Sequence, residues 1–295
     1  MNNADIARLL CLAALWGGSF SFMRVVAPVF GGIGTMWLRI GIAGLVLLAY
    51  ARITHVDLGF GKWWKQYLFI GLMNSALPFA LFAFAMKTLP AGYGAILNGA
   101  APFFAAIFAA LMLKEKLSTA RMVGLLLGFT GVGVVMNLGT LTLDHETLVA
   151  AAACIAATCS YGFIIVYTKK YTQGAPNMGI AVGTLLLPAI VVTPLGVASV
   201  PAAWPTAIVL FSLLGLAIFC SAIAYLFYFR LIRDVGPTKA ITVTFLVPVF
   251  GVIWGALFFG ESLNCGALLG GVLVLIGVAL VLEVVPGKWS TAATS

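Results

Sequence analysis

The chain has 295 residues, of which 63% are hydrophobic and only 8% are charged, and its mean hydropathy is +1.14. A water-soluble domain of this length would not have such a composition, which therefore predicts a protein that crosses the membrane many times. A formal net charge of +8 could indicate a nucleic-acid partner in a soluble protein, but here the positions of the basic residues in the loops explain it better.

Ten segments are long and apolar enough to span a membrane, which takes about 20 helical residues because the hydrocarbon layer is about 30 Å thick. The connections between them are too short for a soluble domain, so any function must lie within the helices. The first segment opens with Asp5 instead of a basic cluster, and we expect it to be retained and not cleaved as a signal peptide. The sequence predicts an all-α membrane protein with helices at 6–28, 32–51, 65–86, 91–113, 119–137, 147–168, 177–198, 206–231, 238–259 and 265–283.

The first two predicted helices each carry a distinctive feature. In 6–28, Trp16 and Ser19 flank two glycines, which would let another helix backbone or a ligand come close beside a large ring; a loose counterpart places Tyr161 before a glycine in 147–168. Arg39 lies about 10 Å deep in 32–51 by helical rise. A charge there costs several kcal/mol unless it has a partner, water or a route to the interface. It either snorkels outward to helix-end carbonyls or contacts a substrate carboxylate.

Residues 75–136 and 221–282 are two copies of one sequence that align without a gap at a constant offset of 146 residues. Apolar residues match by chance in such a chain, so the weight lies in the matched prolines, glutamates and glycines. We predict two five-helix repeats, 1–140 and 141–295, and the offset of five helices, an odd number, inverts the second relative to the first. The matched residues are Pro102 with Pro248, Glu115 with Glu261, Leu117 with Leu263, Gly124 with Gly270, and Gly131 with Gly277.

The repeat also pairs aromatic and polar positions in 65–86 with 206–231 and in 91–113 with 238–259. Aromatic residues three apart share a helix face, and a proline inside a spanning helix frees a carbonyl and bends the helix, which suits a gate. Such an aromatic stripe is either the wall of a substrate cavity or a packed or lipid-facing surface. The predicted cavity residues are Trp16, Ser19, Phe79, Phe82, Tyr93, Asn98, Tyr161, Tyr225, Tyr228, Thr244 and Trp254, and the predicted gating prolines are Pro102 and Pro248.

The last helix of each repeat is predicted to pack against other helices and not to contact the substrate. The glycine-spaced stretches 124–128 and 266–270 are typical of helices whose backbones approach closely, which gains dispersion contacts where lipid gives no hydrophobic drive. Glu115 and Glu261 precede these helices, where a carboxylate can accept hydrogen bonds from free amides and oppose the positive end of the helix dipole. We predict that both glutamates are structural caps.

The basic residues alternate along the chain as the positive-inside rule requires when both termini are cytoplasmic. The repeat agrees, because Glu115 has a lysine on either side whereas Glu261, on the predicted outer side, has none. Only Arg24, Arg39 and Lys87 depart from the rule. The predicted cytoplasmic set is Arg8, Arg52, Lys62, Lys65, Lys114, Lys116, Arg121, Lys169, Lys170, Arg230, Arg233, Lys239 and Lys288.

A Trp-Gly start, an arginine in the second helix and, twice over, a proline followed by a glutamate and spaced glycines resemble the EamA family of the drug/metabolite transporter superfamily. The resemblance covers essentially the whole chain and is closest to the bacterial aromatic amino-acid exporters. It implies a multi-pass protein of the bacterial inner membrane that exports amino acids and other metabolites through a cavity between two five-helix halves. The second copy has no equivalent of Arg39, which argues against a strictly symmetric site. The residues that carry the resemblance are Trp16, Gly17, Arg39, Pro102, Glu115, Gly124, Gly131, Pro248, Glu261, Gly270 and Gly277.

We therefore expect export of aromatic and other amino acids, with broad specificity, by alternating access. The sequence places no titratable carboxylate or histidine at membrane depth, which predicts an uncoupled facilitator and not an enzyme. The alternatives are an exporter of other metabolites, organic cations or phosphate esters, with or without proton coupling. The five cysteines match no metal-ligand spacing, so no metal or cofactor is expected. The expected partners are a small-molecule substrate and the lipid bilayer, with no nucleic acid, and the protein is expected to be a monomer or a weak homo-oligomer.

Overall fold

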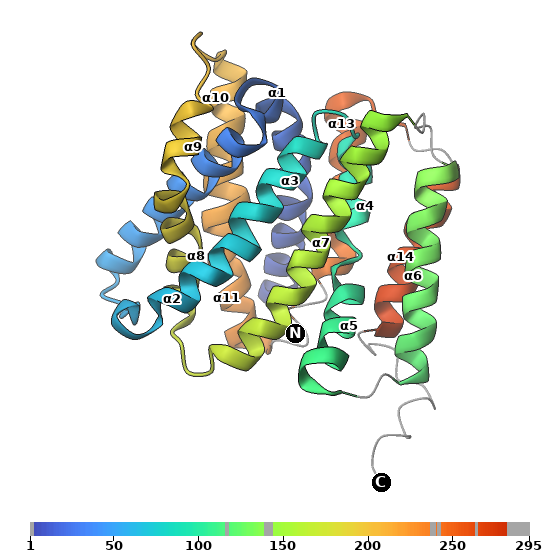
Figure 1. The fold of residues 1–295 in the computed structure, drawn as a ribbon, viewed down its shortest axis with the longest axis horizontal. Coiled ribbons are helices and arrows are strands. Elements are labelled where there is room, and N and C mark those ends of the chain that lie inside the picture. The colour runs from blue at the N-terminus through green and yellow to red at the C-terminus, as the bar shows by residue number, and fades with distance from the viewer. Residues whose placement is uncertain are drawn as a thin grey trace.

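The computed structural model describes residues 3–115, 118–138, 144–236, 240, 243–262 and 265–281. Within these residues the chain is helical and contains no strand. The helices pack into one bundle, with α6 and α14 side by side at one edge (Figure 1). The predictions that concern Lys116, Leu117, Lys239, Leu263 and Lys288 fall outside the described residues.

The first half of the chain begins with a helix that covers two predicted spans. This helix, α1 (Asn3–Ile53), bends at Gly31, whose φ of 66° and ψ of 179° are readily adopted only by glycine. The next predicted span begins as α2 (Phe60–Gly71), continues as the π-helical segment Leu72–Ala76 and ends as α3 (Leu77–Ala85). The half is completed by α4 (Ala91–Asn98), α5 (Ala101–Leu113) and α6 (Thr119–Leu138).

The second half follows the same order. It begins with α7 (His145–Tyr171), followed by α8 (Asn177–Val191) and the short α9 (Thr193–Ala198). Then α10 (Ala207–Leu214), a second π-helical segment (Gly215–Ile223) and α11 (Ala224–Val235) form one continuous run. The last two described helices are α13 (Val243–Phe259) and α14 (Cys265–Val281).

The helices are long and apolar enough to cross a membrane. Five runs meet this condition in full, namely 3–53, 60–85, 91–113, 145–171 and 207–235. Shorter apolar helices occupy 119–134, 177–191, 243–259 and 268–281. All of them lie where the sequence predicts spans, so the described chain is an all-helical membrane protein.

The two predicted gating prolines lie in different surroundings. Because α4 ends at Asn98 and α5 begins at Ala101, Pro102 lies in the first turn of a new helix, where its missing N–H is not needed. Pro248 lies inside α13, which continues through it from Val243 to Phe259. The predicted span 91–113 is therefore two helices, whereas the described part of its equivalent is one.

Glycines bring α6 and α14, the two helices for which the sequence predicted close backbone approach, into contact with each other. A methyl group added to Gly124 would lie 2.7 Å from the carbonyl oxygen of Gly277, and one added to Gly131 would lie 2.8 Å from that of Gly270. At such distances no side chain fits, so the packing requires glycine. The contact is reciprocal, because Gly124 is the repeat equivalent of Gly270 and Gly131 that of Gly277.

Two further glycines, Gly17 and Gly162, make equivalent contacts between the halves. Gly17 of α1 packs against α13, where an added methyl group would lie 2.8 Å from Cβ of Phe250. Gly162 of α7 packs in the same way against Phe104 of α5. Phe250 follows Phe104 by 146 residues, and Gly162 follows Gly17 by 145. Equivalent residues thus make equivalent contacts, each across the boundary between the halves.

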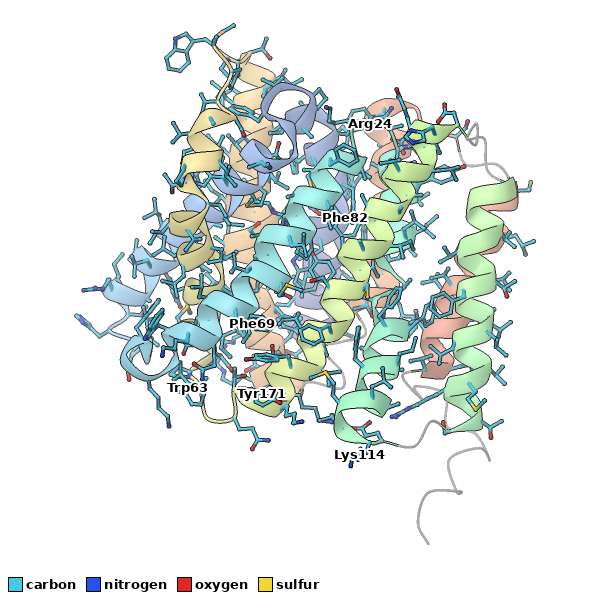
Figure 2. The ribbon with its side chains drawn as sticks, in the orientation of Figure 1. Arg24, Trp63, Phe69, Phe82, Lys114 and Tyr171 are labelled. Carbon is cyan, nitrogen blue, oxygen red and sulfur yellow. The ribbon has the colours of Figure 1, made fainter. Side chains whose placement is uncertain are left out.

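The bundle has two ends, which we name after charged residues labelled in Figure 2. The Lys114 end also carries Trp63 and Tyr171, and the Arg24 end lies opposite.

Replacing Gly124 by leucine should destabilise the protein, because the new side chain would meet the backbone of Gly277. Overpacking of this kind costs about 1–3 kcal/mol, so thermal unfolding in detergent should begin at a lower temperature. Gly133 on the same helix is a matched control, since a Cβ there meets no atom within 4 Å. Gly133→Leu should therefore unfold like the wild type, and equal losses in the two variants would contradict the close approach of α6 and α14.

Candidate functional site

A buried arginine lies between the two halves of the sequence. Arg39, which follows the bend at Gly31 in α1, is only 4% exposed. Its guanidinium carbon lies 3.7 Å from the centre of the Phe79 ring on α3, and its Nε donates a hydrogen bond of 2.8 Å to Ser221 Oγ in the second π-helical segment. Its remaining hydrogen bond goes to Met23 Sδ at 3.8 Å. Because the side chain is buried and bonded to Ser221 and Met23, it does not take the outward, snorkelling position that the sequence left open. No described carboxylate pairs with the guanidinium.

The π-helical segments place serines at this site. Adding the repeat offset of 146 to Leu72–Ala76 gives 218–222, which lies inside the second segment, Gly215–Ile223. Ser75 and Ser221 are therefore equivalent residues in equivalent wide turns, and both are buried. Ser221 Oγ also donates to the carbonyl oxygen of Leu216 at 3.1 Å, five residues earlier. π-helical turns are rare and often occur at functional sites, which fits their position beside Arg39.

Two tyrosines and a cysteine complete the surroundings of the guanidinium. Tyr161 of α7, Tyr225 of α11 and Cys220 lie close enough to Arg39 to interact with its charge. The hydroxyl of Tyr225 accepts a hydrogen bond of 3.2 Å from Nδ2 of Asn74. The predicted cavity residues Phe79, Tyr161 and Tyr225 are thus brought together around Arg39.

Two ring pairs flank this cluster in equivalent positions. Trp16 of α1 lies against Tyr228 of α11 with ring centres 5.4 Å apart, and Tyr161 of α7 lies against Phe82 of α3 with ring centres 6.1 Å apart. Tyr228 follows Phe82 by 146 residues and Tyr161 follows Trp16 by 145, the same offsets as in the glycine contacts. The pairs Trp16–Tyr228 and Tyr161–Phe82, all four of them predicted cavity residues, are therefore equivalent contacts in the two repeats.

Trp254 and Ser19 are committed to contacts within the protein. Trp254 Nε1 donates a hydrogen bond of 2.9 Å to the carbonyl oxygen of Ala14 on α1. Ser19 Oγ donates to the carbonyl oxygen of Trp16, three residues earlier on its own helix, at 2.6 Å. The Trp254 bond joins α13 to α1, whereas the Ser19 bond lies within α1. Both polar groups already have a partner and offer less to a ligand than the sequence suggested.

The other predicted cavity residues, Tyr93, Asn98 and Thr244, make no described contact with Arg39. Tyr93 is 1% exposed and packs with Ile96, Phe103 and Val274, toward α14. Asn98 ends α4 at the break before α5, and its Oδ1 is buried without a hydrogen-bond partner in the described residues. Thr244 is half-buried near the start of α13. Tyr93 is therefore better described as core than as a cavity wall.

Glu261 caps a different helix from the one that follows it in sequence. Its carboxylate accepts hydrogen bonds of 2.8 and 3.1 Å from the amides of Ala91 and Gly92, which begin α4, and the described part of α14 donates none to it. It also forms an ion pair with Arg24, whose guanidinium lies over the Phe259 ring at 4.7 Å. The side chain of Glu261 is only 7% exposed. This explains Arg24, one of the three exceptions to the charge rule, as the partner of a buried carboxylate.

Glu115, predicted as the equivalent cap, forms ion pairs at the Lys114 end. It contacts Lys169 of α7 at 3.1 Å and Arg121 of α6 at 3.4 Å. The first turn of α6 is capped instead by Ser118, whose Oγ accepts from the amide of Arg121 at 3.2 Å. The hydrogen bond from Lys169 holds the pKa of Glu115 below its usual value, so this ion pair persists at neutral pH and is lost only in acid.

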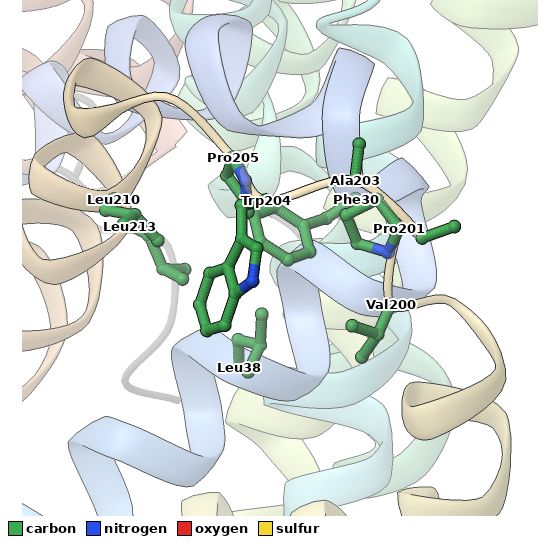
Figure 3. Close-up of a pocket in the computed structure, with 10 residues that line it drawn as sticks. Phe30, Leu38, Val200, Pro201, Ala203, Trp204, Pro205, Leu210 and Leu213 are labelled. Carbon is green, nitrogen blue, oxygen red and sulfur yellow. The ribbon is translucent and has the colours of Figure 1, made fainter.

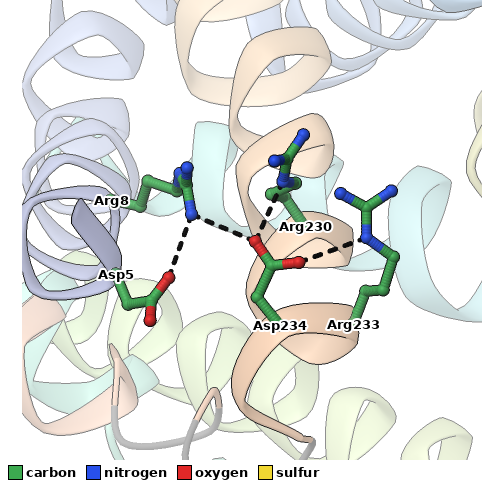
Figure 4. A network of polar contacts seen from close by, with 5 residues as sticks. All are labelled: Asp5, Arg8, Arg230, Arg233 and Asp234. Carbon is green, nitrogen blue, oxygen red and sulfur yellow. Dashed lines mark hydrogen bonds and ion pairs between the residues drawn. The ribbon is translucent and has the colours of Figure 1, made fainter. Parts of the chain in front are cut away.

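A second charged network joins the start of α1 to the end of α11 (Figure 4). Arg8 contacts Asp5 at 2.9 Å and Asp234 at 3.1 Å, and Asp234 also contacts Arg230 at 2.9 Å and Arg233 at 3.2 Å. The first-half equivalent of Asp234 is a threonine, so this network is not repeated. It adds charged contacts to one end of the bundle only.

Two hollows occur away from Arg39. A cavity of about 300 Å³ lies beside the bend in α1 and is lined by apolar residues, among them Phe30, Leu38 and Trp204 (Figure 3). A smaller cavity of about 160 Å³ lies among α5, α6, α7 and α14 and includes Glu115 and Lys169. Neither is lined by Arg39. The first offers no charged group to a ligand, and the second borders the ion pair at the Lys114 end.

Comparison with known proteins decides the family. A profile of the EamA-like transporter family matches the chain twice, over residues 6–137 and 148–283. The chain belongs to the EamA-like transporter family. It is therefore a multi-pass membrane transporter of a small-molecule substrate and not an enzyme.

Relatives cover nearly the whole transporter. The uncharacterized transporter YvbV of Bacillus subtilis (strain 168) is 26% identical over 283 residues, covering 92% of this chain and 90% of that protein. Protein PecM of Dickeya dadantii (strain 3937) is 24% identical over 275 residues, covering 92% and 89%. One solved crystal structure shares the fold with a TM-score of 0.68 at 16% identity, covering 95% of this chain and 96% of that chain.

Sequence reasoning missed several residues of the transporter's Arg39 site. Ser221, Met23, Asn74 and Cys220 were not singled out, although all four are close partners of Arg39 or of Tyr225. For Ser221 a signal existed, because it is identical to Ser75 in the repeat. For the others no signal existed, since single small or polar residues are common in spanning helices.

Replacing Ser221 by alanine should destabilise the folded transporter, because it leaves the Nε–H of a buried guanidinium without an acceptor. An unsatisfied buried donor costs about 1–3 kcal/mol, which thermal unfolding in detergent should report as a lowered midpoint. Ser212→Ala is the matched control, since Ser212 is also buried in the same helical run but its side chain forms no hydrogen bond with the described residues. A midpoint lowered equally by both substitutions would contradict the anchoring of Arg39 by Ser221.

Proposed function

We propose that this transporter exports aromatic and other amino acids across the bacterial inner membrane by alternating access, as an uncoupled facilitator. The observation that carries the proposal is the buried guanidinium of Arg39, which has no carboxylate partner among the described residues and lies among aromatic rings from both halves. An amino acid supplies the missing carboxylate and, when aromatic, a side chain for the rings. Apolar walls discriminate a methylene by only about 1–3 kcal/mol, so specificity is broad.

The chain crosses the membrane ten times as two inverted repeats, 1–140 and 141–295, with both termini in the cytoplasm. In a pair of units related by a two-fold axis, residue i of one contacts residue j of the other, and j contacts i. The contacts Gly124 to Gly277 and Gly131 to Gly270 follow this rule and support the inversion. The two separate matches to the family profile support the division into repeats.

Alternating access is supported by a pair of equivalent ion pairs at opposite ends. Arg24 with Glu261 and Lys169 with Glu115 are related by the offsets 145 and 146, like the glycine and ring contacts. The carboxylate of Glu261 is 7% exposed and that of Glu115 is 34% exposed. This difference supports a state in which the Arg24 end is the more tightly closed, and breaking one pair while forming the other would reverse it.

Transport requires no coupling ion. A proton carrier within the membrane needs a titratable group that both sides can reach. The described acidic residues all lie in loops or in the first or last turn of a helix, namely Asp5, Asp57, Glu115, Asp144, Glu146, Asp234 and Glu261. The same absence argues against an organic-cation exporter, and a phosphate-ester carrier would need more basic groups than Arg39 supplies in the described site.

Counterflow in proteoliposomes tests the proposal. Vesicles loaded with unlabelled phenylalanine should accumulate labelled phenylalanine, and more slowly threonine, lysine and glutamate, without any ion gradient. Tyr225→Ala should slow this entry because it removes a ring and a hydroxyl beside Arg39. Trp204→Ala is the control, since Trp204 is 93% exposed and is not among the described contacts of Arg39. Entry that appears only after a proton or sodium gradient is imposed would contradict uncoupled transport, and no entry under any gradient would contradict amino-acid export.

A further inference from the structure

We infer that the carboxylate is the obligatory recognition element of the substrate and that its amino group is dispensable. The transporter then carries carboxylates with an apolar side chain and no amine, and it excludes amines that lack a carboxylate. This inference rests on the proposed function only in placing the substrate at Arg39.

Arg39 has more hydrogen-bond donors than the protein satisfies. A guanidinium has five N–H donors. Among the described residues, Nε donates to Ser221 Oγ and one Nη to the thioether of Met23, which is a weak acceptor. The remaining Nη donors form no hydrogen bond with the described residues. They form the edge of the guanidinium that binds a carboxylate through two parallel hydrogen bonds.

The guanidinium is oriented before any ligand arrives. The Phe79 ring lies 3.7 Å from its carbon and fixes the plane, while the bond to Ser221 fixes the Nε edge within that plane. Little ordering is then left for binding to accomplish. A lysine at this position would keep the charge but present no planar pair of donors.

Among the described residues, no comparable partner for an ammonium group lies beside Arg39. The described carboxylates lie at helix ends or in loops, away from Arg39. Aromatic faces attract cations, but the face of Phe79 is already occupied by the guanidinium. The hydroxyls of Tyr161 and Tyr225 are neutral and serve a hydroxyl or oxo group as well as an amine.

Binding of an amine that lacks a carboxylate would be unfavourable at this site. It would leave the Nη donors of Arg39 unsatisfied and would place a second positive charge beside a buried guanidinium, where like charges repel strongly. An amino acid avoids this because its carboxylate lies between the two positive groups. The site therefore selects for negative charge first and for side-chain shape second.

Three ligands that share a phenyl ring separate the two groups: phenylalanine, 3-phenylpropionate and phenethylamine. Their dissociation constants for the purified full chain in detergent are measured by titration calorimetry. We expect 3-phenylpropionate to bind within about tenfold of phenylalanine, and phenethylamine to bind about 100-fold more weakly or not at all, as expected for the loss of charge-assisted hydrogen bonds. Phenethylamine binding as tightly as phenylalanine would overturn the inference.

Variants test whether Arg39 itself makes the discrimination. Arg39→Gln should weaken 3-phenylpropionate by about 10- to 100-fold and abolish its advantage over phenethylamine, and Arg39→Lys should recover part of it. Arg52→Gln, an exposed arginine at the end of the same helix, should leave the ratio of the two dissociation constants unchanged. If Arg39→Gln does not fold, Ser221→Ala should still reduce the ratio. A folded Arg39→Gln or Ser221→Ala variant that keeps the wild-type ratio would overturn the assignment to Arg39.

The outcomes separate this inference from the proposed function. Binding of phenylalanine without binding of 3-phenylpropionate would overturn the inference and leave amino-acid export standing. Binding of 3-phenylpropionate without binding of phenylalanine would support the inference and contradict amino-acid export. Binding of none of the three would overturn both.

Discussion

Helices in a bilayer are surrounded by lipid as apolar as they are, so they associate through close packing and not through burial from water. In this transporter that close packing is made between the two halves of the sequence, and it is made twice. Gly124 meets Gly277 as Gly131 meets Gly270, and Gly17 and Gly162 pack against equivalent phenylalanines of the opposite half. The two ring pairs and the two ion pairs also join equivalent residues of opposite halves. A bundle built in this way has two equivalent ends, so closing either one uses the same set of interactions.

Arg39 breaks this equivalence. The corresponding span of the second half, 177–198, contains no charged residue. The helix contacts are therefore duplicated, but the arginine is not. Its guanidinium contacts Phe79 of one half and Ser221 of the other. A single charge contacted from both halves is reachable from both ends in turn, whereas two equivalent charges would bind two ligands or repel each other. The cost of burying the guanidinium is offset in part by the ring and the serine, and the substrate carboxylate supplies the rest.

Composition and the length of the apolar runs were enough to predict where the helices lie, and glycine spacing predicted close backbone approach by the last helix of each half. The family was predicted from a resemblance in a small set of motif residues. Sequence patterns failed where a contact joins distant parts of the chain. Glu261 precedes α14, so a local cap was the natural prediction, but its amide partners begin α4, 170 and 169 residues away. Tyr93 lies in the right helix but faces α14, because an aromatic residue in an apolar helix carries no sign of which neighbour it faces. The role of Ser221 emerges only once the fold brings it to Arg39.

The central claim is that the ion pairs of Glu261 and Glu115 close opposite ends around one site. Cys220, which is 1% exposed and lies beside Arg39, is a native reporter of access to that site. In a background without the other four cysteines, its reaction with a membrane-impermeant thiol reagent is measured from each face of the membrane. Glu261→Gln should raise the rate from the Arg24 end about tenfold, as loss of an ion pair worth about 1.4 kcal/mol would, and Glu115→Gln should raise it from the Lys114 end. Faster reaction from the same face in both variants, or from neither, would contradict the account.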